Sequence, residues 1–562
     1  MKPLLPRVAY FCMEYGLSEE LPIYAGGLGI LAGDYVKSAG DLKLPLTAIG
    51  IFWSEGYTVQ KIGADHKPHD AYPATPRDAL EPLSVRVTVR VRGKDVVLAA
   101  HRVKKHATGP LYLLEPVDEA DRWITRRLYG GGGDDRVAQE IILGVGGVRL
   151  LRALGIDVDV YHFNEGHAVF AGLELMRERM VQGETFAQAR KSVREQVVFT
   201  THTPVVAGNE THEIDLLLDQ GADLDTFTVE QLADIGGDPF GMTVAGLRLS
   251  RIANGVAELH GDTSRRMWAH VEDAAPIVAV TNGVHPPTWQ DARIRVAYAG
   301  DTLWETHQQL KRELSDEVQR RTGHPVHLER LVVGFARRAA PYKRSDLIVS
   351  HARFLDPLLA AGKLQVLFSG KAHPRDSLGK EIVANLAQVA RRYPGSVIFL
   401  ENYDMKLGRM LTRGADIWLN NPRRPLEASG TSGMKAAMNG VLNLSILDGW
   451  WPEGVVHGVN GWQIGDGYEA VDPEDPHDQD AHDRAALEKT LLGDVLPTYA
   501  DRARWVAMMK ASIEMSQWKF STDRMIEDYY VKLYRPQALP RAATSPPVSP
   551  GDTSARHKRA AG

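Results

Sequence analysis

The chain has 562 residues, a length that fits about three to four domain-sized units or two large α/β domains. Hydrophobic residues make up 44% and charged residues 24%, so disorder over the whole chain is excluded and a large core can be buried. The 66 Lys and Arg against 71 Asp and Glu leave a net charge of −5, which argues against nucleic acid as a partner.

The cysteine content and the apolar runs bear on the cellular compartment. The single cysteine, Cys12, cannot form an internal disulfide and favours a reducing environment. No stretch approaches the ~18 apolar residues of a membrane helix, and prolines and an arginine interrupt the N-terminus, unlike a signal peptide. We therefore expect a cytoplasmic protein that does not bind membranes.

Short apolar runs alternate with helical patterns in the first half of the chain. Such runs predict buried parallel strands, here at 8–13, 46–53, 160–163, 197–201 and 277–281. A helix is predicted over 135–154, because Val137, Ile141, Val145 and Val148 share one face. Between 84 and 116 apolar and polar residues alternate instead, which predicts an inserted antiparallel hairpin with its turn at 92–94.

The second half of the chain repeats this pattern. Strands are predicted at 331–336, 364–368, 397–400, 417–419 and 442–447, with helices between them such as 345–361. The sequence thus predicts two doubly wound α/β domains, 1–285 and 286–536, with ligands in the cleft between them. The helical segment 501–534 contains candidates for helices that cross back to the first domain. The Pro- and Ser-rich stretch 537–562 is predicted to be a disordered tail.

Two glycine-rich segments could serve a cleft. Gly26, Gly27 and Gly29 precede a helical pattern, where glycines let backbone N–H groups approach an anion, although a plain turn explains them equally well. The run 130–133 is interpreted as a flexible loop that could move over the cleft.

A basic cluster follows the strand predicted at 331–336. Its four cations are Arg337, Arg338, Lys343 and Arg344, and at the carboxyl end of a buried strand they favour an anion site over a solvated charged turn.

The segment 427–440 places a Gly/Ser/Thr loop before a short helix. Lys435 lies among Met434, Ala436 and Ala437, and apolar surroundings lower the pKa of a lysine and make its amine a nucleophile toward an aldehyde. The loop itself offers donors to a phosphate. An exposed helical lysine is the equal alternative from this segment alone.

Two histidines, His167 and His202, follow predicted strands, where structural roles are the commoner ones. Neither lies in a metal-binding spacing, and the chain has no Cys/His cluster, so we expect no metal.

Together these segments resemble the α-glucan (glycogen, starch or maltodextrin) phosphorylases, in their short bacterial and archaeal branch. The resemblance runs from Val8 to about Pro536, and Gly430-Thr431-Ser432-Gly433-Met434-Lys435 is its most specific motif. It implies a glycosyltransferase-B fold of two Rossmann-like domains facing a cleft. The implied reaction is reversible phosphorolysis, in which α-1,4-glucan and inorganic phosphate give glucose 1-phosphate and a shortened glucan. The implied cofactor is pyridoxal 5′-phosphate, and the family suggests a homodimer.

The resemblance also implies roles for individual residues. The cofactor is carried by the Lys435 amine. It is contacted by a second set of residues: Thr431, Ser432, Gly433, Arg337, Tyr403 and Gly27. Arg338 and Lys343 are similar to ligands of the substrate phosphate, and together with Lys435 and His202 they are the implied catalytic residues. Glucose is implied to bind at Glu427, Ser429, Gly430, Asn282, His202 and Gly27. Glu165 and His167 lie on a segment that lines the cleft, without assigned roles.

Two other functions compete with this one. A nucleotide-sugar-dependent glucan synthase shares the fold but lacks the cofactor lysine. A non-catalytic glucan-binding protein would have lost the phosphate ligands, whereas Arg338, Lys343 and Lys435 are all present.

Overall fold

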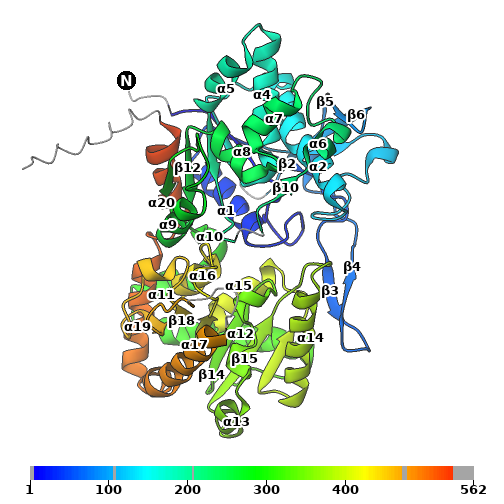
Figure 1. The fold of residues 1–562 in the computed structure, drawn as a ribbon. Helices are drawn as coiled ribbons and strands as arrows, with labels where there is room; N and C mark the ends of the chain where they lie inside the picture. The colour runs from blue at the N-terminus through cyan, green and yellow to red at the C-terminus, as the bar shows by residue number, and fades with distance from the viewer. Residues whose placement is uncertain (1–4, 106–108, 206–207, 471–476, 536–562) are drawn as a thin grey trace, which may run out of the picture.

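The computed structural model describes residues 5–105, 109–205, 208–470 and 477–535. Two α/β halves lie one above the other; the first part of the chain builds the upper half, the next part builds the lower one, and the last helix returns to the upper half (Figure 1). The expected tail at 537–562 lies outside the described residues.

The upper half is built on a mixed sheet of nine described strands, in the order β13-β12-β9-β8-β1-β2-β7-β6-β5. Neighbours from β13 to β7 are parallel, whereas β6 pairs antiparallel with both β7 and β5. The strands are β1 (Val8–Phe11), β2 (Leu46–Ile51), β5 (Leu80–Val91), β6 (Lys94–Val103), β7 (Leu111–Pro116), β8 (Val160–Asn164), β9 (Val197–Thr200), β12 (Ile252–Gly255) and β13 (Ile277–Ala279). The hairpin of β5 and β6 turns at Arg92 and Gly93, both with positive φ.

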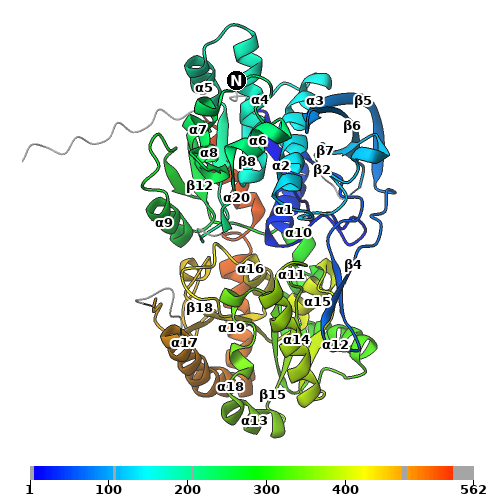
Figure 2. The ribbon, with the colours of Figure 1, turned by 45° about the vertical axis from the view of Figure 1, so that its right-hand side comes forward.

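Helices flank this sheet on both sides (Figures 1 and 2). They are α1 (Gly27–Asp41), α2 (Gly133–Ile141), α3 (Gly147–Ala153), α4 (Phe170–Val181), α5 (Phe186–Arg194), α6 (Ile214–Gln220), α7 (Val229–Gly236), α8 (Met242–Leu249) and α9 (Glu258–Met267). The helix predicted over 135–154 is present, but a π-helical turn at Ile142–Gly146 divides it. Glycines in this turn allow close packing, since a Cβ at Gly144 would lie 2.4 Å from the Ala171 backbone nitrogen.

The lower half has a six-stranded sheet in the order β16-β15-β14-β17-β18-β19, parallel throughout. Its strands are β14 (Leu331–Ala336), β15 (Leu364–Ser369), β16 (Val397–Leu400), β17 (Ile417–Asn420), β18 (Leu442–Ile446) and β19 (Gly461–Ile464). Its helices are α11 (Ala292–Tyr298), α12 (Leu303–Thr322), α13 (Ala352–Ala360), α14 (Ser377–Arg392), α15 (Met405–Gly414), α16 (Thr431–Met438), α17 (His477–Thr490), α18 (Leu496–Ala500) and α19 (Arg502–Ser516). The α/β class is confirmed.

The prediction of a helix over 345–361 is wrong for its first part, because α13 begins only at Ala352. Before it the chain makes two short 3-10 turns. Arg344 adopts a left-handed conformation with φ 49° there and donates to the carbonyls of Asn421 and Pro422. These tertiary contacts hold the segment in an irregular path.

Several strands were not predicted. They are β12, β19, the short pair of β10 (Thr211–His212) and β11 (Phe240–Gly241), and a hairpin of β3 (Val59–Ile62) and β4 (Pro68–Ala71). This hairpin descends from the upper half beside α14 of the lower half (Figures 1 and 2).

The chain passes between the halves twice. It first crosses through a segment around α10 (Pro286–Trp289), and then α20 (Thr522–Tyr529) returns to pack on α1 (Figure 2). Tyr534 follows α20 and bonds to Tyr35 and His162 through its hydroxyl group, at 2.5 and 2.7 Å. The C-terminal helix therefore belongs to the core of the upper half.

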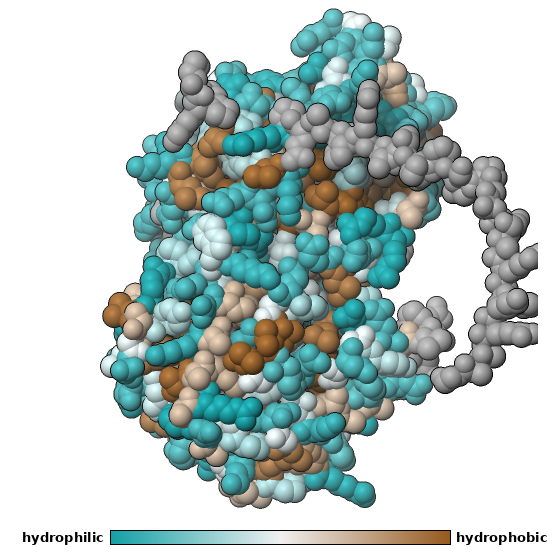
Figure 3. All heavy atoms as spheres, turned by 90° about the vertical axis from the view of Figure 1, so that its left-hand side faces the viewer, coloured by the Kyte–Doolittle hydropathy of each residue, from teal (hydrophilic) through white to brown (hydrophobic). Residues whose placement is uncertain are grey.

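The surface is of mixed character. Figure 3 shows one side of the molecule, on which groups of hydrophobic residues are broken up by hydrophilic ones. Among the described helices, none is both long and apolar enough to cross a membrane.

Candidate active site

A cavity of about 570 Å³ lies between the two halves. Loops that follow the carboxyl ends of β1, β8, β9, β14, β15, β16 and β17 line it, as expected for doubly wound sheets. The cavity brings together most of the predicted site residues: Gly27, His202, Asn282, Arg337, Arg338, Lys343, Tyr403, Glu427, Ser429, Gly430, Thr431, Ser432 and Lys435. Gly433 is buried in α16, where a Cβ would lie 2.5 Å from Asn443 Oδ1.

The first glycine loop is held open toward the cavity by Glu14. This buried carboxylate accepts from the backbone N–H groups of Ala25 and Gly26 at 2.6 and 3.2 Å, and from the Tyr129 hydroxyl at 2.7 Å. A Cβ at Gly27 would meet no atom within 4 Å, so this glycine faces open space. The N-terminus of α1, which has no side-chain cap, thus offers free N–H groups at the cavity.

Two of the four cations in the basic cluster are paired inside the cavity. Arg337 forms an ion pair with Glu427, and Lys343 Nζ lies 3.1 Å from the same carboxylate. Burial would raise the pKa of Glu427, but these two cations outweigh it and lower that pKa to about 2. The group is therefore a charged triad with a net charge of +1 (two cations and one carboxylate).

The other two cations of the cluster differ from this pair. Arg344 turns away from the cavity and pairs with Asp480 and Asp483, so its predicted place in the anion site is wrong. Arg338 is exposed to the cavity and has no ion pair within the described chain. It is therefore the cation most available to a bound anion.

Lys371 adds a cation that sequence reasoning missed. It follows β15, lines the cavity and donates to the Thr58 carbonyl at 3.0 Å. Burial lowers the pKa of Lys371 to about 8, with Asp404 acting in the opposite direction. The rule that pointed to Arg337, a cation directly after a buried strand, would also have found Lys371.

Lys435 is buried with its amine at the cavity. Its Nζ lies 3.7 Å from the centroid of the Trp289 ring. Burial lowers the pKa of Lys435 to about 8, whereas the nearby Asp34 carboxylate raises it. A neutral, nucleophilic amine is therefore accessible here at mildly alkaline pH.

Several polar atoms of the cavity wall lack protein partners. The buried atoms Arg337 Nη1, Ser429 Oγ and Asn282 Oδ1 have no hydrogen bond within the described structure. The helix α16 also begins here, at Gly430 with φ 87°, without a side-chain cap. Buried polar groups are normally satisfied, so this wall is suited to a polar, anionic ligand.

On the upper wall, His202 and Glu165 form one unit. Glu165 accepts from the His202 backbone N–H at 2.8 Å and from the Thr203 hydroxyl at 3.2 Å. Burial raises the pKa of Glu165 to about 7. Burial lowers the pKa of His202 to about 3, so its ring is neutral and hydrogen-bonded to Asn164 Oδ1 at 2.7 Å.

His167 lines the cavity together with a second group of charged residues. Its Nε2 is 3.6 Å from Glu210 Oε2, and Arg136 pairs with the other oxygen of Glu210 at 2.9 Å. Glu140, Glu210 and His212 together could hold a metal ion, with ligand atoms within 4.8 Å of one another. The expectation of no metal therefore stays a prediction. The glycine run 130–133 leads into α2, which carries Glu140 and Arg136.

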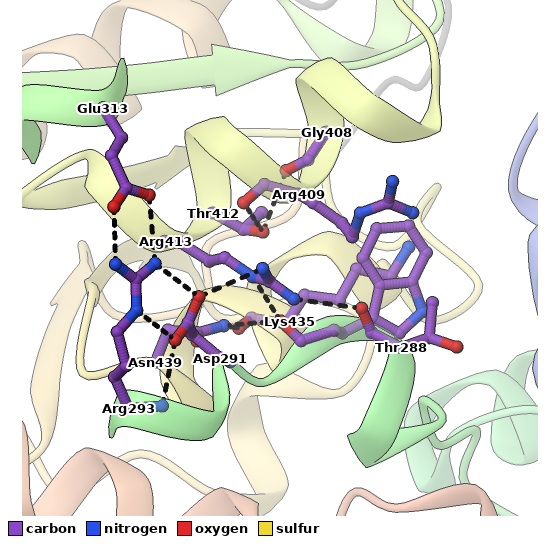
Figure 4. A network of polar contacts seen from close by, with 11 residues as sticks. Thr288, Asp291, Arg293, Glu313, Gly408, Arg409, Thr412, Arg413, Lys435 and Asn439 are labelled. Atoms are coloured by element: carbon purple, nitrogen blue, oxygen red, sulfur yellow. Dashed lines mark hydrogen bonds and ion pairs between the residues drawn. The ribbon is translucent and has the colours of Figure 1, made fainter. Parts of the chain in front are cut away.

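The backbone around Lys435 is tied to the first crossing between the halves (Figure 4). Asn439 Nδ2 donates to the carbonyls of Lys435 and Trp289 at 2.8 and 3.0 Å. Arg413 donates to the carbonyls of Trp289 and Thr288 at 3.1 Å each. This network fixes Trp289 under the amine, and neither Trp289 nor Asp34 had a sequence signal of its own.

Comparison with known proteins agrees with this geometry. The sequence model of a family described as carbohydrate phosphorylase matches residues 297–452, which include the basic cluster and Lys435. A maltodextrin phosphorylase of Thermococcus litoralis is 40% identical over 94% of this chain and 70% of its own length.

Two glycogen phosphorylases also match along nearly the whole chain. That of Mycobacterium tuberculosis (strain H37Rv) is 38% identical over 94% of this chain and 71% of its own length. That of Aquifex aeolicus is 35% identical over 94% of this chain and 86% of its own length. With such identity over most of both sequences, and with the predicted residues gathered around one cavity, the chain belongs to the carbohydrate phosphorylase family.

Proposed function

We propose that the protein is an α-glucan phosphorylase of the glycosyltransferase-B type. It would transfer the terminal glucosyl unit of an α-1,4-glucan to inorganic phosphate, giving α-glucose 1-phosphate and a glucan shortened by one unit. The observation that carries this proposal is a buried lysine, Lys435, in the same cavity as the unpaired Arg338. The names of the relatives, maltodextrin and glycogen phosphorylase, support the substrate class.

The cavity fits pyridoxal 5′-phosphate as the cofactor. Lys435 would hold it through its amine, and the uncapped start of α16 at Thr431 and Ser432 would bind its phosphate. Arg337 Nη1 and Ser429 Oγ, both buried and without partners, offer further donors. When bound, this cofactor supplies a phosphate group that exchanges a proton with the substrate phosphate.

The residues of the cavity would prepare the reaction chiefly by charge. Substrate phosphate would bind at Arg338, with Lys343 and the N–H groups at the start of α1 around it. These cations offset the repulsion between neighbouring anions. Glu427 is held by Arg337 and Lys343 as an ionised acceptor for a glucose hydroxyl.

The opposite wall would orient the sugar. Asn282 Oδ1 is free to accept a hydrogen bond from a sugar hydroxyl group. The His202 ring is neutral and hydrogen-bonded to Asn164, so it would not act as a charged group. The backbone carbonyl of His202 would instead stabilise, through its dipole, the positive charge that develops at the anomeric carbon. Closing the two halves around the substrates would exclude water and favour phosphate as the acceptor.

A cytoplasmic location and a homodimeric state complete the proposal. The single cysteine, Cys12, is free and buried, which supports a reducing compartment. The homodimer rests on the family resemblance alone.

Two measurements on the purified chain test the proposal. Borohydride reduction should fix one pyridoxyl group on the peptide that contains Lys435, and Lys435→Ala should abolish both the label and phosphorolysis. Incubation with maltodextrin should release glucose 1-phosphate only when inorganic phosphate is present. Lengthening of a glucan from a nucleotide sugar instead, with release of the nucleoside diphosphate, or a label on another lysine, would refute it.

A further inference from the structure

Lys435 lies near residues from two other parts of the chain, α1 and α10. Asp34 comes from α1 in the upper half and is fully buried, with 0% exposed. Both of its carboxylate oxygens accept from Trp289 Nε1, at 2.9 and 2.7 Å. Trp289 ends α10 at the crossing, and its ring lies under the Lys435 amine at 3.7 Å from Nζ. The indole therefore contacts the carboxylate with its edge and the amine with its face.

The Trp289 ring is held by its bonds to Asp34, and the backbone that carries it is held by several more. Its carbonyl accepts from both Asn439 and Arg413, and Asp291 two residues on is bound by Arg413 and Arg293 (Figure 4). A rigid platform thus sets where the amine and the carboxylate lie.

The charges near the amine are few. Lys37, on the same helix as Asp34, lowers the pKa of the Lys435 amine, whereas Asp34 raises it. The Lys37 amine donates to Thr288 Oγ1 at 3.2 Å. His285, near Asp34, is paired with Asp41 at 2.9 Å. Lys435, Asp34, Lys37 and His285 are the charged or titratable groups that face one another here. Burial raises the pKa of Asp34, whereas Lys435, Lys37 and the Trp289 N–H group favour its ionised form. The ionised carboxylate and the aromatic face both stabilise the protonated Lys435 amine, and Lys37 destabilises it.

We propose that Asp34, held by the Trp289 indole, is a positioning residue that aims the Lys435 amine and controls how readily it releases its proton for cofactor capture. This inference rests on the proposed role of Lys435. In that step the protonated Lys435 amine would give one proton to solvent, and its neutral nitrogen would bond to the aldehyde carbon of the cofactor. The two protons left on the nitrogen would then leave with the aldehyde oxygen as water. No oxidant or reductant is needed.

The test follows cofactor capture rather than enzyme activity. The full chain, freed of cofactor, is mixed with pyridoxal 5′-phosphate, and the rate of capture is measured by absorbance across a pH series. In Asp34→Asn the midpoint of this profile should fall by about one pH unit, since a neighbouring opposite charge shifts a pKa by roughly 1–3 units. Lys37→Met should move it upward.

Two further variants separate charge from structure. Asp41→Asn makes the same change on the same helix, at a carboxylate that pairs with His285, and should leave the midpoint unchanged. Trp289→Phe removes the N–H group that holds Asp34, keeps an aromatic face, and should lower the midpoint by less than Asp34→Asn does. It decides the question if Asp34→Asn does not fold.

The inference is overturned if Asp34→Asn and Trp289→Phe keep the wild-type midpoint, or if Asp34→Asn and Lys37→Met shift it in the same direction. Failure of the proposed function is seen separately. In that case the wild-type chain would take up no borohydride-stable label at Lys435.

Discussion

Arg338 differs from its neighbours Arg337 and Lys343 because those two pair with Glu427 and Arg338 does not. Removing it should therefore weaken anion binding without leaving a buried carboxylate unpaired. We predict that Arg338→Ala lowers kcat/KM for phosphate by about 100-fold or more, the scale of losing one charged contact in a transition state. Initial rates at varied phosphate and fixed maltodextrin measure this.

The control for this variant is Arg353→Ala, an exposed arginine on α13 at the far end of the lower half (Figure 1). It should behave like the wild type. An unchanged phosphate dependence in Arg338→Ala would contradict the assignment of this residue to the phosphate.

Glu165 should make stability depend on pH. Burial raises its pKa in the folded chain from 4.5 to about 7. Between these values the folded state holds a proton that the unfolded state has lost, so stability falls as the pH rises through this window. The unfolding midpoint of the wild type, compared with Glu165→Gln, should therefore be relatively higher at pH ~5 than at pH ~7.5. Parallel pH profiles for the two proteins would show that Glu165 is ionised throughout.

At the scale of elements, the hairpin of β3 and β4 joins the upper half to the lower one. Gln60 on β3 exchanges two hydrogen bonds with the backbone of Ala372, at 3.0 and 3.3 Å, and Asp70 on β4 pairs with Lys380 of α14 at 2.6 Å. Lys371, which lines the cavity, directly precedes Ala372. The hairpin thus supports the loop after β15.

Gln60→Ala would leave the buried backbone groups of Ala372 without partners. We expect a loss of about 1–3 kcal/mol in the free energy of unfolding, the usual cost of such groups. Denaturant titration measures this loss. The matched control is Lys61→Ala, the next residue on the same strand, whose side chain is exposed. Equal effects of the two substitutions would mean that the contact with Ala372 contributes nothing.

At the scale of the whole molecule, α20 and the residues after it pack into the core of the upper half, which the first part of the chain builds. Met525, Leu533 and Tyr534 are fully buried in the upper core, at 0% exposed. A chain ending after Arg535 should keep its unfolding temperature and its phosphorolysis, because the Pro- and Ser-rich sequence of 537–562 offers few apolar side chains to the core.

A chain ending after Ser521 should instead lose the cooperative unfolding transition, because the core of the upper half would be opened. Circular dichroism melts of the two truncated chains compare these outcomes. A stable chain without α20 would contradict the packing argument.

Much of this protein could be predicted from sequence, because the signals concerned are local. The strands at 331–336 and 397–400 were predicted to the residue, since buried parallel strands are unbroken apolar runs. The segment around Lys435 left a reactive amine and an exposed lysine equally open, and the resemblance of its motif to the family favoured the reactive amine. The family itself followed from such motifs and is shown by the relatives.

Only the tertiary structure decided which side chains meet. Arg344 shares the basic cluster with Arg338 but turns toward Asp480, because partners more than 100 residues away determine its direction. Asp34, Trp289 and Lys435 are separated by 255 and 146 residues (289 − 34 and 435 − 289) and no pattern links them. The sequence alone determined which strand ends carry the charged side chains. The tertiary structure decided the pKa of each of these side chains, because burial and contacts with distant partners arise only when separate segments pack together and exclude water.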